Sequence, residues 1–161
     1  MTLLKNYQQR ILGLMIDLEF KLAELYAILS EQFYAQREFW SSISAEELEH
    51  AEWLEYLYKK AGDGSLMFNE ESTKTYTVEA FLSYLTGVIE KAKHRDLSLA
   101  QALSLSLDIE KSMLEKKVFE HFQSNSLDLK NVLKTLKDET ERHATTIRGM
   151  WLRCKGEPVC A

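Results

Sequence analysis

The sequence predicts an all-α protein, a four-helix bundle with a short extra helix in its longest connection. Proline occurs once among 161 residues, at Pro158, and glycine six times, so few residues end helices or form tight turns. Apolar residues recur at intervals of three and four over long stretches, which is the spacing of one helix face. Hydrophobic residues make up 45% of the chain and charged residues 28%, which is typical of a globular domain.

Four long amphipathic helices and one shorter helix account for most of the chain. We expect them at Leu3–Ala35, Arg37–Ala61, Val78–Lys93, Ser98–Gln123 and from Ser126, as the N-cap, to Arg153. The Gly62-Asp63-Gly64 sequence ends the second helix, and Ser124-Asn125-Ser126 separates the last two. Two hairpins of long helices joined by a long crossover have the connectivity of a ferritin-like bundle. We expect one domain, residues 1–153, followed by an irregular tail, residues 154–161.

The charge and the apolar segments exclude several classes of protein. The formal net charge is −5, whereas a nucleic-acid-binding protein needs a basic surface. No apolar stretch approaches the roughly 18 residues that span a bilayer. The first residues, Met1–Gly13, lack the pattern of a signal peptide. We therefore expect a cytoplasmic protein that binds neither nucleic acid nor membranes.

Both cysteines, Cys154 and Cys160, lie in the last eight residues, so they cannot form a framework for the fold. The Gly156-Glu157-Pro158 turn between them allows a reversible disulfide. The alternative, which we favour, is a pair of free thiols on a loose tail.

Polar residues interrupt the apolar face near the middle of each long helix. They are Glu19 on the first helix, Glu47 and His50 on the second, Glu110 on the third, and Thr140 and His143 on the fourth. A lone buried carboxylate is costly because it loses its hydration. Several carboxylates around a divalent cation avoid this cost, and oxygen and imidazole ligands suit iron, manganese or zinc. The sequence therefore predicts a metal site inside the bundle.

The strongest part of this pattern is Glu47 followed three residues later by His50, because residues at that spacing share a helix face. With Glu19 from the neighbouring helix, they form half of a dimetal carboxylate site. Other interpretations compete. Ser44 and Glu47 fit a capping box at a helix start, and His50 alone fits a hydrogen-bonded core histidine. Glu19 equally fits a partner of a buried Lys or Arg. The case for Glu110 is weaker, because charged residues surround it.

At this point the sequence resembles a known family. The first half, with Glu19, Tyr26, Phe39-Trp40 and Glu46-Glu47-Leu48-Glu49-His50-Ala51, resembles a rubrerythrin-type ferritin-like domain. The segment from Ala102-Leu103 to Glu110-Lys111-Ser112, followed by His143, resembles the second half. The resemblance implies one or two iron ions, with manganese or zinc as alternatives. The ligands it implies are Glu19, Glu47, His50, Glu110 and His143.

The chain departs from the family pattern in two places. Thr140 occupies a position where the family has a bridging glutamate, and only a local helical bulge would bring the adjacent Glu139 inward. The chain also lacks the two CxxC pairs of a rubredoxin-like module, so a peroxidase cycle would need an external electron donor.

The function we expect is that of an iron-dependent oxidoreductase acting on oxygen or peroxide, with an incomplete second metal half-site. The alternatives are a non-enzymatic metal-handling protein, and a helical scaffold or interaction bundle whose metal site has decayed. A homodimer is compatible with the resemblance.

Overall fold

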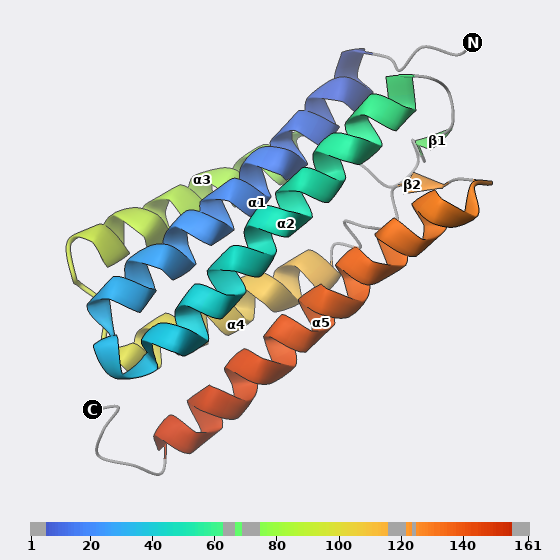
Figure 1. Ribbon diagram of the computed structural model, residues 1–161. Helices are drawn as coiled ribbons and strands as arrows, with labels where there is room; N and C mark the ends of the chain where they lie inside the picture. Colours follow the sequence, from blue (N-terminus) through green and yellow to red (C-terminus); the bar gives the residue numbers. More distant parts are fainter. Residues whose placement is uncertain (1–5, 63–66, 69–74, 116–121, 124, 156–161) are drawn as a thin grey trace.

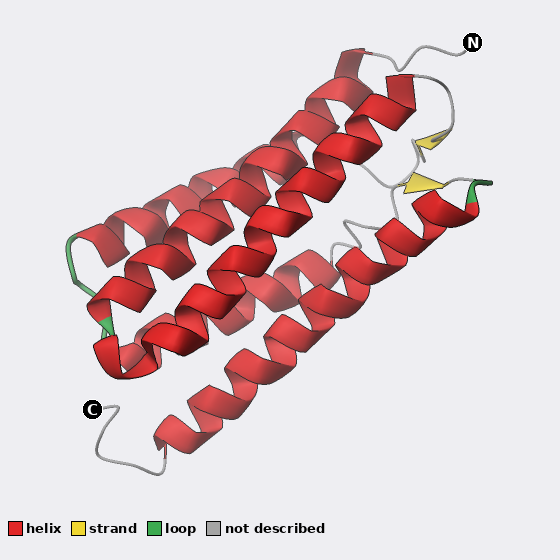
Figure 2. Cartoon of the chain, viewed as in Figure 1, coloured by secondary structure: helices red, strands yellow, loops and turns green. Residues whose placement is uncertain are grey.

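The computed structural model of the protein describes residues 6–62, 67–68, 75–115, 122–123 and 125–155, and this part of the chain is all-α (Figures 1 and 2). The α-helices are α1 (Asn6–Gln32), α2 (Arg37–Gly62), α3 (Thr75–Lys93), α4 (Leu99–Glu115) and α5 (Leu127–Lys155). A 3-10 turn, η1 (Tyr34–Gln36), joins α1 to α2. Two short strands, β1 (Met67–Phe68) and β2 (Phe122–Gln123), pair in an antiparallel ladder.

Successive helices alternate in direction, as Figure 1 shows. Helix α1 packs along both α2 and α3, and α4 packs along α5. The helix expected within the crossover is therefore a 19-residue element lying against α1. Among the described helices, none combines the length and the apolar character needed to cross a membrane.

The helix boundaries differ from the expected ones mainly at the carboxyl ends. Helix α1 ends at Gln32 rather than at residue 35 because Phe33 leaves helical geometry, with φ −106° and ψ 77°. The prediction of one helix through Gln123 is wrong, because Phe122 and Gln123 pair with β1 instead. The amino end of α4 is capped by two reciprocal hydrogen bonds. The backbone N–H of Gln101 donates to Ser98 Oγ, and the backbone N–H of Ser98 donates to Gln101 Oε1.

Helix α5 continues two residues beyond the expected end. Cys154 is therefore helical and buried, and it is disulfide-bonded, so the preference for free thiols is wrong. Cys160 and the rest of the expected tail, residues 156–161, lie outside the described residues.

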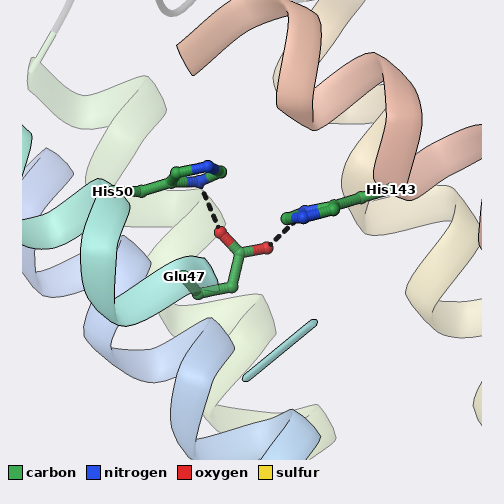
Figure 3. Close-up of side chains that lie close together, drawn as sticks. All are labelled: Glu47, His50 and His143. Atoms are coloured by element: carbon green, nitrogen blue, oxygen red, sulfur yellow. Dashed lines mark hydrogen bonds and ion pairs between the residues drawn. The ribbon is translucent and has the colours of Figure 1, made fainter. Parts of the chain in front are cut away.

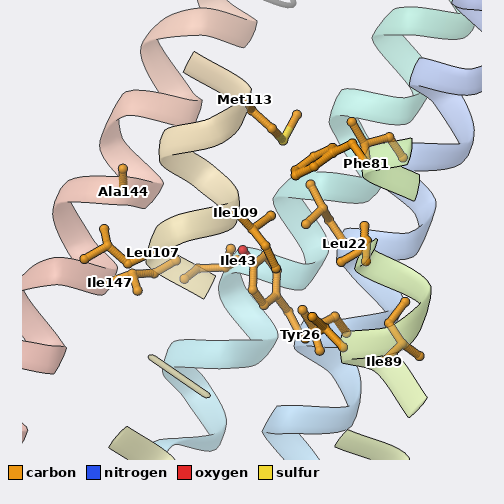
Figure 4. Close-up of a cluster of buried hydrophobic side chains, with 14 of the residues drawn as sticks. Leu22, Tyr26, Ile43, Phe81, Ile89, Leu107, Ile109, Met113, Ala144 and Ile147 are labelled. Carbon is orange, nitrogen blue, oxygen red and sulfur yellow. The ribbon is translucent and has the colours of Figure 1, made fainter. Parts of the chain in front are cut away.

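All five helices contribute to the hydrophobic core. Figure 4 shows Leu22 from α1, Phe81 from α3 and Met113 from α4 lying near one another, with Ile147 from α5 on the other side of the cluster. Ring stacking adds to this packing, since the Tyr26 and Trp40 rings lie 5.7 Å apart between centroids. The core therefore encloses the middle of each long helix, where the sequence places its polar residues.

Candidate metal centre

The five residues expected to bind metal are all buried in the interior. Their exposed fractions are 1% or less, as is that of Thr140. They come from four different helices: Glu19 from α1, Glu47 and His50 from α2, Glu110 from α4, and His143 from α5. Each lies near the middle of an amphipathic helix, so packing of the apolar faces brings the polar groups to the same level.

Glu47 lies at the centre of the cluster (Figure 3). Its Oε2 atom is 2.8 Å from Nδ1 of His50, and its Oε1 atom is 3.0 Å from Nδ1 of His143. The two imidazole rings are stacked with centroids 5.4 Å apart. One ligand atom from each of these three residues lies within 4.8 Å of the other two. The group is thus compact enough to hold a metal ion.

Glu19 and Glu110 lie on either side of this group. Oε2 of Glu19 is 3.8 Å from Nδ1 of His50, and Oε1 of Glu110 is 3.9 Å from Nδ1 of His143. The Tyr26 hydroxyl donates a 2.5 Å hydrogen bond to Oε1 of Glu110. Each histidine Nδ1 therefore faces two carboxylates, one of which belongs to Glu47.

Two further carboxylates contact the same histidines and were not predicted in this role. Oε2 of Glu139 is 2.8 Å from Nε2 of His50, and Oε2 of Glu46 is 2.7 Å from Nε2 of His143. Both side chains are about three-quarters buried. Each glutamate stands four residues before a histidine on its own helix, but this spacing does not indicate a contact with the histidine of the other helix.

Thr140 provides no carboxylate to the cluster. Its hydroxyl donates to the Leu136 carbonyl oxygen at 2.9 Å, within its own helix. Helix α5 is regular through this region, so the bulge considered for Glu139 is not formed. Glu139 instead reaches the outer nitrogen of His50 from the side of the helix.

The capping-box interpretation of Glu47 is wrong. Helix α2 begins at Arg37, ten residues earlier, so Ser44 and Glu47 lie inside the helix. The Ser44 hydroxyl donates to the Ala23 carbonyl oxygen at 2.8 Å and joins α2 to α1.

Burial and neighbouring charges shift the pKa values of the groups in the cluster. Burial, reinforced by the negative charge of Glu47, raises the pKa of Glu19 to about 8 and that of Glu110 well above its usual range. Burial lowers the pKa of both histidines, but their carboxylate partners outweigh it: the pKa of His50 rises to about 11, and that of His143 is also raised. Burial likewise opposes ionisation of Glu47, yet its close contacts with His143 and His50 leave its pKa below the usual range.

The orphaned atoms of the cluster fit a cation. Among the described residues, Oε2 of Glu19, Oε2 of Glu110 and Nδ1 of His50 are buried without a hydrogen-bond partner. The short contact between His50 Nδ1 and Glu47 is at ion-pair distance but lacks hydrogen-bond geometry. Unpaired buried polar atoms are costly. Cations held beside these atoms would satisfy them, and their oxygen and nitrogen donors are those that iron, manganese and zinc accept.

The free energy of unfolding of the metal-free protein should fall as pH rises from about 6 to 9. Folding raises the pKa of His50 from 6.5 to about 11. The stabilisation from this shift is fully present below the pKa of the unfolded state. It is lost as pH rises towards and through the pKa of the folded state. The raised pKa of Glu19, from 4.5 to about 8, acts in the same direction over its own range.

Urea titrations of the EDTA-treated protein, followed by circular dichroism at each pH, measure this slope. The His50→Gln variant should have a shallower slope. A free energy of unfolding that is constant or increases over this range would contradict the raised pKa values of His50 and Glu19.

A scan of protein-family models finds none that matches the chain, and searches of curated proteins and of solved structures likewise find no match.

Proposed function

We propose that this protein is a ferritin-like metal protein of the rubrerythrin type, and that it acts as an iron-dependent oxidoreductase on oxygen or peroxide. One observation carries the proposal: the two carboxylate oxygens of Glu47 face Nδ1 atoms of histidines from two different helices. Glu19 and Glu110 supply a second carboxylate to each side. This two-sided arrangement supports the proposal of a dimetal carboxylate site, of the kind that four-helix bundles hold.

Glu19, Glu47 and His50 would hold one cation, and Glu110, His143 and Glu47 would hold the other. Iron bound there supplies electron exchange with oxygen or peroxide. The chain itself holds the ligands and excludes water, since every ligand side chain is buried.

Proton placement is a second task for the chain. Burial raises the pKa of Glu110 well above its usual range, and the Tyr26 hydroxyl donates a hydrogen bond to the same carboxyl group. The Tyr26 hydroxyl is therefore a proton donor beside the proposed centre. Electrons must come from an external donor, because two cysteines are too few for a four-thiolate iron site.

Thr140 favours a second candidate function. The cluster has three central carboxylates where the family pattern has four, so the second half-site is incomplete. The two candidates that follow are metal handling without turnover, and a helical scaffold in which the protonated network replaces the metal.

Elemental analysis of protein purified without a histidine tag tests metal binding. We expect stoichiometric iron in the wild type, its loss in His50→Ala, and its retention in His94→Ala. His94 is exposed, with Nδ1 2.7 Å from the Glu90 carbonyl oxygen, so it is a matched control. Absence of metal at saturating iron, manganese and zinc concentrations would refute the proposal and leave the scaffold.

Anaerobic loading with ferrous iron followed by peroxide separates catalysis from metal handling. We expect peroxide consumption proportional to the bound iron and continued turnover when a chemical reductant is added. Tight iron binding without accelerated peroxide consumption would favour metal handling.

A further inference from the structure

Glu46 and Glu139 contact the histidines in a reciprocal pattern. Glu46 of α2 pairs with His143 of α5, and Glu139 of α5 pairs with His50 of α2. Each glutamate thus contacts the histidine of the opposite helix, and not the histidine that lies four residues after it on its own helix. The two helices are cross-linked twice at the level of the proposed metal centre.

The two nitrogens of each ring have separate partners. In both histidines Nδ1 faces the buried carboxylates, whereas Nε2 faces the outer glutamate. The outer carboxylates are partly exposed, and the inner ones are not. A neutral imidazole that donates from Nε2 must present its lone pair at Nδ1, towards the interior.

We infer that Glu46 and Glu139 are positioning residues that fix the tautomer and ring orientation of the opposing histidine, so that each Nδ1 is ready to bind a cation. The inference rests on the proposed metal centre. A carboxylate on the second nitrogen of a metal-bound histidine typically strengthens binding by 10–100-fold. Glu46 is itself held in place, because it also accepts from the Arg142 guanidinium.

Two other roles are opposed by the geometry. A ligand role for Glu46 or Glu139 requires its carboxylate on the Nδ1 side of the ring, yet both lie on the Nε2 side. A general attraction of cations by negative charge would not depend on which histidine each glutamate contacts. The pairing therefore provides a specific test.

Zinc affinity of the full-length, tag-free chain tests the inference, with Glu139→Gln and Glu46→Gln as variants. Each should bind zinc at least about 10-fold more weakly than the wild type. Glu141→Gln removes the same charge from an exposed position on α5 and should change the affinity less than about threefold. The glutamines keep the size of the side chains, so folding should be retained, which circular dichroism verifies.

Proton–nitrogen NMR of the zinc-loaded protein separates positioning from a merely structural role. In Glu139→Gln the Nε2–H signal of His50 should shift and exchange faster with water, and that of His143 should not. Glu46→Gln should give the converse.

Wild-type affinity in both glutamine variants, or equal changes at both histidines in each, would overturn the inference while leaving the metal centre intact. Failure of the wild type to bind zinc, iron or manganese would overturn the proposed function itself.

Discussion

Replacement of Glu47 by glutamine should abolish metal binding and strongly destabilise the metal-free protein. Among the described residues, Glu47 is the only central carboxylate that contacts both His50 and His143, so both proposed cation positions would lose a ligand. Without metal, the change leaves two buried histidines, both with raised pKa values, without their shared carboxylate partner. Removing one partner of a buried ion pair costs about 3–5 kcal/mol.

Equilibrium unfolding in urea and zinc titration measure the two effects. Glu49→Gln provides the control, because Glu49 is exposed two residues later on the same helix, and we expect wild-type behaviour from it. A Glu47→Gln variant that retains both stability and stoichiometric metal would show that Glu47 is not the shared ligand.

Replacement of Thr140 by glutamate should have opposite effects on the metal-free and metal-loaded states. Thr140 is buried three residues before His143 on the same helix, so a glutamate there would supply the fourth carboxylate that the proposed site lacks. We expect cation affinity to rise at least about 10-fold, in the range over which charge-bearing ligands alter metal sites. In the metal-free protein the extra buried carboxyl group should cost about 1–3 kcal/mol.

Thr140→Gln is the matched control, since it adds the same volume without the charge. It should share any cost of overpacking but gain no affinity. If glutamate and glutamine at this position give the same metal affinity, Thr140 does not occupy a ligand position, and the incomplete half-site must be explained elsewhere.

The positions of the helices followed from the apolar periodicity, because burying one face of each helix dominates its stability. The carboxyl ends of the helices could not be predicted from this periodicity. Phe33 ends α1 without a glycine or proline, and its backbone geometry is set by the turn into α2. The pairing of Phe122 with Phe68 joins segments 54 residues apart, and local periodicity carries no information about such a contact.

The buried members of the site were predictable for a related reason. Glu19 is a charged residue at a position where the helix face is otherwise apolar, and this exception to the pattern can be seen in the sequence. Glu46 and Glu139 create no such exception, because they lie at the edge of the stripe among exposed charged residues. Their role depends on how α2 and α5 lie against each other, which the sequence alone does not specify.

The contacts between α2 and α5 at the candidate metal centre also determine which helices separate first during partial unfolding. Helix α2 packs closely along α1, and α5 along α4, whereas α2 and α5 approach less closely. The polar bridges between α2 and α5, from His50 to Glu139 and from His143 to Glu46, span this seam. Amide hydrogens of α4 and α5 should therefore exchange as one cooperative unit, and a cation that spans the seam would slow that opening.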